Sequence, residues 1–481
     1  MFTLILCIGS GLVGGLLVAV VPAAKNRLRN MVVLFFTGLG MICSWQVARK
    51  VLAGERLRLA GQIGGLSLCL DPDPLGVVFG LIAATLWLFA VVYSLGYMEG
   101  KDHQRTYYAF LLLAFSVTLG VAFAGNLVAF YLFYELLTFT TYPLVIQERN
   151  EGAMQAGTKY LLYNLSGAAV LLLGIVLTAA WGGRLDFAGG PILAGGLKTG
   201  LNWLLFLFLV GFGVKAALMP FHRWLPAAMV APTPVSALLH AVAVVYSGVY
   251  GLLRVVYSVF GTELLGELGF AVLLPWVAAG TILVGIIVAT QQDLLKRRLA
   301  YQTISHLSYI LLGAFTLQPL GLAGAVLQMV GYAVLKTALF FCVGLIVEQT
   351  GVTRVSRMDG VGWALPKTMA AFTVATLGMI GMLPLGTFWG KYYLMKGSVA
   401  GGKWPLALVL VGSGLINAVC FIPVVVKAFR GERTRSTATE KGGRVALMLA
   451  PTLLLVVIAL LMGLFPGMVW PLVQAVVDSF F

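Results

Sequence analysis

Long apolar runs separated by short polar stretches fill nearly the whole 481-residue chain. A helix needs about 20 apolar residues to cross the hydrocarbon core of a bilayer, and the chain has about fourteen runs of that kind. They begin near Phe2, Asn30, Leu75, Tyr107, Leu127, Tyr160, Trp203, Val235, Phe270, Leu299, Leu320, Lys367, Pro405 and Val445. The pattern predicts an all-α polytopic membrane protein, with residues 1–481 forming a single transmembrane domain. The first run lacks a positively charged leading segment, so it is predicted to be a helix and not a cleaved signal.

Composition supports the membrane assignment and excludes other classes. Hydrophobic residues make up 60% of the chain and charged residues only 10%, against about 25% charged in soluble domains. The net charge of +15 comes from basic residues in short loops, without an aromatic-interleaved basic patch, so we expect no nucleic-acid partner. The expected surroundings are a lipid bilayer.

The distribution of lysine and arginine predicts the orientation of the chain. Short loops rich in these residues stay on the inner side of a membrane. Loops after odd-numbered helices contain Lys25, Arg27 and Arg29, then 296–298, Arg354, Arg357 and the segment 427–444. We therefore expect a multi-pass protein of the cell (inner or plasma) membrane with both termini outside. The second loop, with Arg49, Lys50, Arg56 and Arg58, is the exception to this pattern.

Two of the predicted helices are interrupted by proline. The seventh contains GFGVKAALMPFHRWLP, with Pro220 and Pro226, and the twelfth contains GMIGMLPLGTFWGK, with Pro384. Proline removes a backbone donor, so the freed carbonyls need protein or water partners. In transporters, breaks at matching positions of two repeats mark the ion pathway. We predict two five-helix units, 107–260 and 270–430, preceded by three helices in 1–106 and followed by helix fourteen in 445–481.

Four charged residues lie within apolar helices: Glu135, Lys215, Lys336 and Lys391. A charge at the centre of a bilayer helix costs about 2.5–3.5 kcal/mol on the scale from insertion experiments, so each needs a partner or a water-filled cavity. We expect Glu135 to pair with Lys215. Burial favours the neutral amine and a nearby carboxylate favours the ammonium, so a change in their separation could move a proton. The alternative is a static structural ion pair, and for Lys391 a side chain that extends to the interface.

Histidines near the breaks are candidates for relaying protons. His222 follows the break in the seventh helix, His240 lies in SALLHAVAVV and His306 lies in TISHLSYI. Each could pass protons near neutral pH, or could be a neutral histidine satisfied by a broken backbone.

The remaining polar residues have simpler interpretations. Arg223 and Arg254 are interpreted as helix-end or packing charges, Asp71 and Asp73 as helix-start residues, and His103 as a solvated loop residue. The five cysteines are scattered, without a CxxC motif, so we expect no iron–sulfur cluster, zinc or nickel, and no cofactor on this chain.

With these residues in place, the sequence resembles the antiporter-like subunits of respiratory complex I, Mrp-type antiporters and group 4 membrane-bound hydrogenases. The resemblance covers most of the chain. Its motifs, in order, are SLGYMEG (94–100), FYELLTFTTYPLV (133–145), GFGVKAALMPFHRWLP (211–226), APTPVSALLHAVAVV (231–245), DLLKRRLAYQTISHLSYI (293–310), LKTALFFCVG (335–344), FWGKYYLMKG (388–397) and GLFPG (463–467).

The resemblance implies fourteen helices, two inverted five-helix repeats and a central hydrophilic axis. It implies that Glu135 pairs with Lys215 and that Lys336 and Lys391 continue the proton path toward the exit. The chain departs from the family pattern where many relatives have a lysine in helix eight and two histidines in helix eleven. Here Tyr246, Gln328 and Tyr332 stand at those positions, and Leu383 and Thr387 replace a proline and a glycine. Tyrosine has a reference pKa of about 10, so Tyr246 and Tyr332 can only pass hydrogen bonds near neutral pH.

Three functions are consistent with these features. The first is a proton-translocating membrane-arm subunit of a redox-driven pump, whose other subunits carry iron–sulfur or nickel–iron centres and perform the redox chemistry. The second is a Mrp-type sodium/proton antiporter subunit, with Glu135, Thr138 and Thr140 offering oxygen ligands to sodium. The third is a non-conducting scaffold, suggested by the lysine and histidines missing at Tyr246, Gln328 and Tyr332.

Overall fold

The computed structural model describes residues 1–22, 25–182, 184–193, 200–431 and 440–481. The first seven helices are α1 (Phe2–Val20), α2 (Asn26–Leu52), α3 (Pro74–Tyr97), α4 (Gln104–Ala122), α5 (Leu127–Val145), α6 (Glu151–Gly182) and α7 (Leu201–Lys215). Later helices are α8 (Trp224–Ala227), α9 (Thr233–Ala241), α10 (Val244–Arg254), α11 (Thr262–Glu267), α12 (Leu274–Gln291), α13 (Leu295–Phe315), α14 (Pro319–Thr350), α15 (Val361–Ala364), α16 (Pro366–Ile380), α17 (Thr387–Ala400), α18 (Trp404–Ala428), α19 (Gly443–Leu464) and α20 (Trp470–Asp478). A hairpin is formed by β1 (Leu59–Ile63) and β2 (Leu66–Leu70).

Most of these helices have the length and composition of membrane spans. In the described part of the chain, eleven are long and apolar enough to cross a bilayer, with α9, α10 and the π-helix Val255–Phe260 counted together. Three further helices of the predicted set correspond to α7, to α13 and to the α16–α17 pair, which are shorter or begin with charged residues. The all-α membrane fold is confirmed, whereas the count of fourteen and the two repeats stay predictions.

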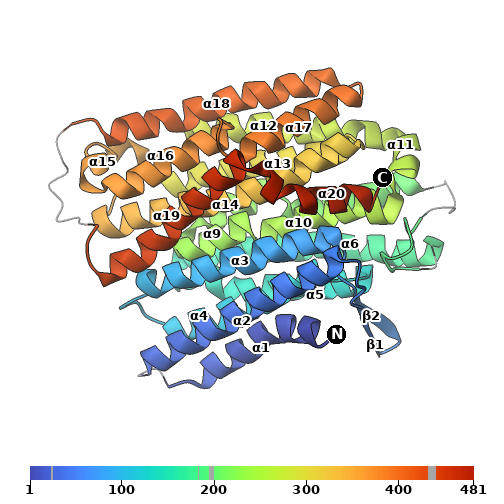
Figure 1. The fold of residues 1–481 in the computed structure, drawn as a ribbon, viewed down its shortest axis with the longest axis horizontal. Helices are drawn as coiled ribbons and strands as arrows, with labels where there is room; N and C mark the ends of the chain where they lie inside the picture. The colour runs from blue at the N-terminus through green and yellow to red at the C-terminus, as the bar shows by residue number, and fades with distance from the viewer. Residues whose placement is uncertain (23–24, 183, 194–199, 432–439) are drawn as a thin grey trace.

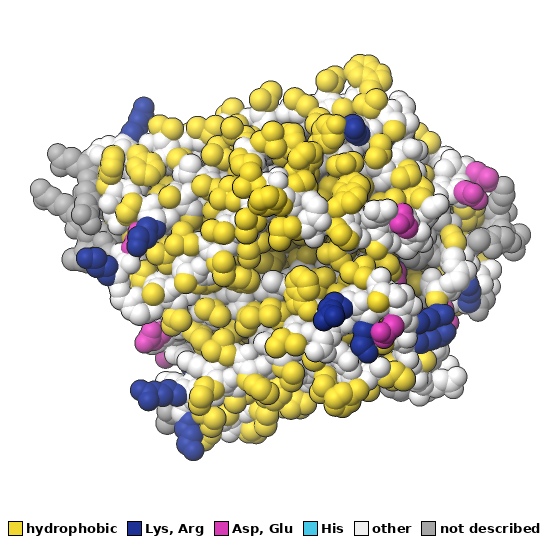
Figure 2. Space-filling view, in the orientation of Figure 1, with side chains coloured by type: hydrophobic (Ala, Val, Ile, Leu, Met, Phe, Trp, Pro, Cys, Tyr) yellow, Lys and Arg dark blue, Asp and Glu magenta, His cyan; other side chains and the backbone are white. Residues whose placement is uncertain are grey.

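The polar parts of the molecule lie at the two opposite ends of the helix bundle. In Figure 1 the helices lie side by side along the longest axis, and both chain termini and the β1–β2 hairpin lie toward the right-hand end. Figure 2 shows hydrophobic side chains over the middle of the molecule, with charged side chains gathered toward its two ends. An apolar middle between two charged ends is the arrangement expected of a protein that spans a bilayer. Part of the basic segment 427–444 used for the orientation prediction, residues 432–439, lies outside the described residues.

Side-chain caps explain where several helices begin. Asp73 accepts a 2.9 Å hydrogen bond from Gly76 N at the start of α3, as the sequence indicated. Asn126 does the same for Ala129 N at 2.8 Å and thereby separates α4 from α5. Helix α6 begins well before the predicted Tyr160, because Asn150 caps it through a 2.8 Å bond from Ala153 N. A capping amide can start a helix ahead of the apolar run.

The hairpin between α2 and α3 was not predicted from the sequence. Its strands pair antiparallel from Leu59 with Leu70 to Ile63 with Leu66, and Gly125 N donates to Cys69 O at 2.8 Å. The interpretation of Asp71 as a helix-start residue was wrong. Its carboxylate accepts a 2.8 Å hydrogen bond from the Arg56 guanidinium, and its backbone N–H donates to Phe123 O.

The two proline-containing interruptions occur where the sequence placed them. Helix α7 ends at Lys215 and is followed by 3₁₀ turns at Phe221–Arg223 and Ala228–Val230 around α8. Helix α16 ends at Ile380, and α17 begins at Thr387. A third interruption, between α9 and α10, was not predicted because it contains neither glycine nor proline. There the backbone N–H groups of Val242 and Ala243 both donate to Leu238 O, directly after His240.

Two glycines allow neighbouring helices to pack against the backbone of the broken segments. A Cβ added to Gly248 of α10 would overlap Ala216 N, and a Cβ added to Gly463 of α19 would overlap Pro384 O. We expect Gly248→Ala and Gly463→Ala each to destabilise the protein by about 1–3 kcal/mol, because the backbone at the break has to move. The measurement is thermal unfolding of the purified protein in detergent. As a control, Gly280→Ala should be tolerated, since nothing lies within 4 Å of its added Cβ. Equal effects at all three positions would contradict the packing argument.

Candidate functional site

Glu135 of α5 and Lys215 at the end of α7 meet inside the bundle. Lys215 Nζ lies 3.8 Å from Glu135 Oε1, and the side chains are 1% and 16% exposed, respectively. The amine also donates a hydrogen bond to Tyr134 O and lies 3.4 Å from the centroid of the Tyr134 ring. Glu135 Oε1 is buried and has no hydrogen-bond partner among the described residues. Backbone and aromatic contacts therefore hold the Lys215 amine against α5. The distance from this amine to the Glu135 carboxylate is near the longest at which two charges form a direct ion pair.

Lys336 is held in the middle of the unbroken helix α14. Its side chain is fully buried, and Nζ donates to Leu299 O at 2.6 Å and to Gln302 Oε1 at 2.9 Å. The rings of Tyr332 and Phe340 lie 5.9 and 5.6 Å from the amine. Among the described residues its hydrogen-bond partners are neutral oxygens and not carboxylates. A buried ammonium can be stabilised by such acceptors, which also leave the amine free to give up its proton.

Lys391 of α17 points into the break between α16 and α17. Its amine donates to Met379 O at 3.0 Å and to Ile380 O at 2.7 Å, and the residue is only 7% exposed. The last carbonyls of a helix lack partners within that helix and carry partial negative charge, which suits an ammonium. The alternative of a lysine that extends to the membrane interface does not describe this side chain.

Two carboxamides connect Lys336 with Lys391. Gln302 of α13 accepts from Lys336, and its Nε2 donates to Asn417 Oδ1 of α18 at 2.8 Å. Asn417 Nδ2 donates at 2.8 Å to Met379 O, the same carbonyl that accepts from Lys391. A continuous chain of hydrogen bonds thus joins the two lysines. Neither amide was predicted from the sequence, although Asn417 is the one amide side chain of the mostly apolar α18.

His306 of α13 belongs to the same network. Its Nε2 lies 3.3 Å from Asn417 Nδ2, and its Nδ1 lies 3.3 Å from Gln328 Nε2. Its ring stacks on Tyr332 with a centroid separation of 5.3 Å. A histidine from α13 therefore faces Gln328 and Tyr332 on α14, the two positions where the family resemblance led us to expect histidines.

The other two candidate histidines differ in their surroundings. His240 is fully buried, neither of its ring nitrogens has a partner among the described residues, and its ring lies 5.4 Å from that of Phe340. His222 is half-buried, and its ring lies 6.0 Å from Tyr301. His240 thus lies close to the helix that bears Lys336, whereas His222 lies outside the hydrogen-bonded chain.

An aromatic stack connects Tyr246 with the group of residues around His306. Tyr246 of α10 donates to Met329 O at 2.8 Å, and its ring lies 6.3 Å from Tyr332. The Tyr332 ring lies in turn against His306, and its hydroxyl has no partner among the described residues. On its other side the Tyr246 ring lies 6.3 Å from that of Phe79 of α3, so the stack runs from α3 through α10 and α14 to α13.

A second ion pair was not predicted from the sequence, in which Arg254 was interpreted as a packing or helix-end charge. It joins the buried guanidinium of Arg254 to Asp73, whose side chain is 33% exposed. The guanidinium is 1% exposed and donates to both carboxylate oxygens of Asp73, at 2.5 and 2.6 Å. It also donates to the hydroxyl of Tyr250, one turn earlier on α10. A bidentate arginine–carboxylate contact is strong and geometrically specific. It fixes the end of α10 to the start of α3, and separation by 181 residues concealed it.

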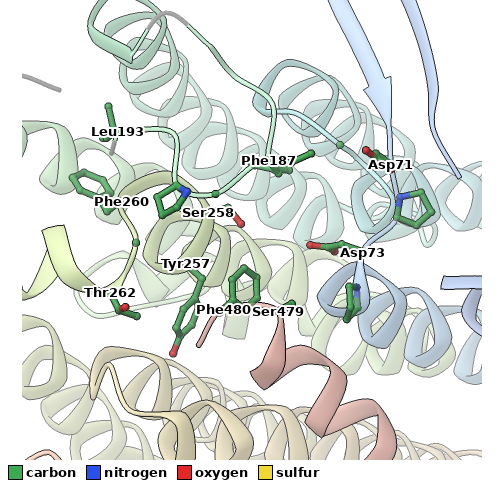
Figure 3. A pocket seen from close by; sticks show the side chains of 18 of the residues that line it. Asp71, Asp73, Phe187, Leu193, Tyr257, Ser258, Phe260, Thr262, Ser479 and Phe480 are labelled. Carbon is green, nitrogen blue, oxygen red and sulfur yellow. The ribbon is translucent and has the colours of Figure 1, made fainter. Parts of the chain in front are cut away.

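This ion pair borders a cleft at the end of the molecule that holds the chain termini. The cleft has a volume of about 980 Å³ and is lined by parts of the hairpin region, the segment before α7, the π-helix and the C-terminus. Figure 3 shows Asp71, Asp73, Tyr257, Ser258 and Phe480 around it. Its lining includes none of Glu135, Lys215, Lys336 and Lys391, so the candidate axis lies apart from this cleft.

Comparison with known proteins agrees with the geometry. Residues 124–417 match the family described as NADH:quinone oxidoreductase/Mrp antiporter, TM. The chain is 35% identical to NADH-quinone oxidoreductase subunit N of Desulforudis audaxviator, over 83% of this chain and 82% of the relative. It is 30% identical to Na(+)/H(+) antiporter subunit A1 of Staphylococcus haemolyticus, over 93% of this chain but 58% of that longer relative.

Solved structures share the fold over nearly the entire chain. The Mrp complex from Dietzia sp. has a matching chain with a TM-score of 0.89 and 21% identity, covering 100% of this chain and 98% of that one. Respiratory complex I from Thermus thermophilus gives a TM-score of 0.85 at 23% identity, covering 99% and 98%. The sequence matches and the shared fold together lead to one assignment. The chain belongs to the NADH:quinone oxidoreductase/Mrp antiporter transmembrane family.

Proposed function

We propose that this chain is a proton-translocating membrane-arm subunit of a multisubunit complex. The observation that carries the proposal is the continuous hydrogen-bonded chain from Lys336 to Lys391, buried within a helical bundle that has the composition of a membrane protein. Intramembrane ionisable groups are unfavourable unless a function retains them. Lys336 and Lys391 contact neutral oxygens, so each can alternate between charged and neutral forms more readily than a lysine in a tight ion pair.

The Glu135–Lys215 pair is proposed to control proton entry into this path. At 3.8 Å the two charges attract each other, but no hydrogen bond fixes the Glu135 carboxylate oxygen among the described residues. A small displacement of α5 relative to the end of α7 would change the attraction. Approach favours the ammonium form of Lys215, whereas separation in an apolar interior favours the neutral amine. The geometry supports a switch over a static brace.

The surrounding complex is part of the proposal. Relatives named as NADH-quinone oxidoreductase subunits support neighbouring membrane-arm subunits and a redox-driven complex. We propose that separate subunits carrying iron–sulfur or nickel–iron centres supply the energy, and that this chain binds no cofactor. The proposed location is the cell membrane, with the basic loops inside and both termini outside.

Reconstitution of the purified complex tests the proposal. We expect Glu135→Gln and Lys215→Ala each to lower coupled proton transport about tenfold or more. A change of about 1.4 kcal/mol in the free energy of the ammonium form of a lysine, relative to its neutral amine, changes the protonation equilibrium tenfold. Transport is followed with a pH-sensitive dye in vesicles energised by the complex's own electron donor, and electron transfer is measured in parallel. Full coupling in both variants would exclude the proposed path, and the scaffold function would then account for the chain.

A sodium/proton antiporter subunit is the second candidate. The antiporter relative of Staphylococcus haemolyticus, 30% identical, favours it. Near Glu135, the hydroxyl of Thr138 is buried without a partner among the described residues, whereas Thr140 donates to carbonyls of its own helix at 2.9 and 3.3 Å. Sodium needs several oxygen ligands. If an imposed sodium gradient alone drives proton movement in the reconstituted vesicles, without an electron donor, the antiporter function replaces the redox-driven one.

A further inference from the structure

Gln302 and Asn417 are the two side chains that connect Lys336 with the Met379 carbonyl, which in turn accepts a hydrogen bond from Lys391. A carboxamide donates through nitrogen and accepts through oxygen, and a rotation of 180° exchanges the two ends. The orientation of each amide therefore determines whether it donates a hydrogen bond to a given neighbour or accepts one. Both are buried, at 0% and 1% exposure, so water does not compete for their hydrogen bonds at the surface.

The carbonyl of Met379 sets the orientation of both amides. A carbonyl oxygen only accepts, so Asn417 must direct its Nδ2 toward Met379 O, where the bond is 2.8 Å. Asn417 Oδ1 then faces Gln302 and accepts from Gln302 Nε2 at 2.8 Å. As a result, Gln302 presents Oε1 to Lys336. An acceptor at this position favours the ammonium form of Lys336.

The same carbonyl also sets the proton position on His306. The second N–H of Asn417 faces His306 Nε2 at 3.3 Å, so Nε2 is the acceptor nitrogen and Nδ1 carries the proton in a neutral ring. Gln328 lies 3.3 Å from Nδ1, and its Oε1 is otherwise without a partner among the described residues. Rotation of the Gln328 amide brings Oε1 to Nδ1–H and satisfies both atoms.

We infer that Gln302 and Asn417 are positioning residues that transmit the geometry of the α16–α17 break to Lys336 and His306. While the end of α16 presents Met379 O, Lys336 holds its proton and His306 Nε2 is free of one. When α16 moves and Met379 O is withdrawn, both amides can rotate. Gln302 then donates a hydrogen bond from its N–H to Lys336 Nζ, and only the neutral amine can accept that bond. Asn417 Oδ1 accepts a hydrogen bond from the protonated His306 Nε2.

The proton balance of this change is simple. One N–H bond on Lys336 Nζ breaks and one N–H bond on His306 Nε2 forms, while the amides rotate and carry no proton themselves. The Tyr332 ring lies near both groups, 5.9 Å from Lys336 Nζ and 5.3 Å from the His306 ring. Its hydroxyl is buried and has no hydrogen-bond partner among the described residues, and we assign the passage of the proton to this group.

The inference rests on the proposed transport function, and variants of the two amides test it in the reconstituted complex. We expect Gln302→Met and Asn417→Leu each to lower proton transport about tenfold. Gln302→Met removes a hydrogen bond to the Lys336 amine, and Asn417→Leu removes the hydrogen bonds that orient Gln302. The double variant should be no worse than the single ones, because both changes interrupt one chain. Thr281→Val, which removes a buried hydroxyl whose one hydrogen-bond partner among the described residues is Val277 O of its own helix, should leave transport unchanged.

An exchange of the two amides provides a rescue that does not depend on apolar substitutions. Gln302→Asn shortens the chain and should lower transport, whereas the double variant with Asn417→Gln restores its total length and should recover at least half of the lost transport. Unchanged transport in Gln302→Asn, multiplicative losses in the Gln302→Met/Asn417→Leu double variant, or no recovery in the exchanged pair would overturn the inference. If Glu135→Gln and Lys215→Ala abolish transport while the amide variants do not, this inference fails and the proposed function stands.

Discussion

Replacing Lys336 with methionine is expected to reduce proton translocation by about a hundredfold or more, in the range observed when a positioned proton-transfer group is removed. Lys336 is fully buried, and its amine is the point where α14 joins the chain of amides that leads to Lys391. Methionine fills a similar volume, so packing should be preserved. Initial rates of vesicle acidification, normalised to the amount of assembled complex, provide the measurement.

A second lysine offers a matched control for this experiment. Lys396 lies on the exposed side of α17, with its amine 4.8 Å from the ring of Tyr392. Lys396→Met removes the same charge from a neighbouring part of the fold, and we expect transport to remain near the wild-type level. If both variants lost transport equally, net charge and not the buried position would be the cause. If Lys336→Met transported normally, the path proposed through α14 would be wrong.

Replacing Asp73 with alanine is expected to destabilise the protein by about 3–5 kcal/mol, because Arg254 would remain charged in a buried site without its partner. The guanidinium is 1% exposed and bonds both Asp73 oxygens. Asp73 also caps α3, which adds about 1 kcal/mol. The loss should appear as a lower midpoint of thermal unfolding for the purified protein in detergent.

Three further variants separate the causes of this loss. Asp73→Asn keeps a capping oxygen but removes the charge, so it should lose most of the stability that Asp73→Ala loses. Asp73→Leu combined with Arg254→Met removes both charges and should be more stable than Asp73→Ala, since apolar replacement of a buried pair is often neutral. Asp186→Ala breaks an exposed pair with Arg58, 3.4 Å long, and should cost less than about 1 kcal/mol. Equal losses at Asp73 and Asp186 would contradict the burial argument.

The pattern of residues was sufficient to predict the class of fold, because the bilayer imposes a simple rule. Every spanning segment must satisfy its backbone internally, so long apolar runs become helices whatever their neighbours are. The breaks after Lys215 and at Pro384 were also predictable, since proline acts on its own helix. The interruption after His240 has no such local cause, and the early start of α6 depended on the capping amide of Asn150.

The positions of the charged residues in the helices could be predicted from the sequence, but most of their contacts could not. Glu135, Lys215, Lys336 and Lys391 could be identified from the sequence because a charge in an apolar run is unfavourable wherever the helix lies. Their contacts could not be identified, with the exception of Glu135 and Lys215, which the structure brings to 3.8 Å. The role of these residues in transport stays a prediction.

The residue pattern along the chain was enough to predict a bundle of membrane helices, the two proline-containing breaks and the ionisable side chains that enter the apolar layer. Apart from the predicted Glu135–Lys215 pair, the contacts of those side chains depended on the packing of the helices. The chain of amides through Gln302 and Asn417 joins four separate helices, and the Asp73–Arg254 pair joins two more. Such contacts depend on how helices distant in sequence are rotated and packed. An amide in an apolar helix looks the same in sequence whether it faces lipid, bonds its own backbone or orients a buried lysine.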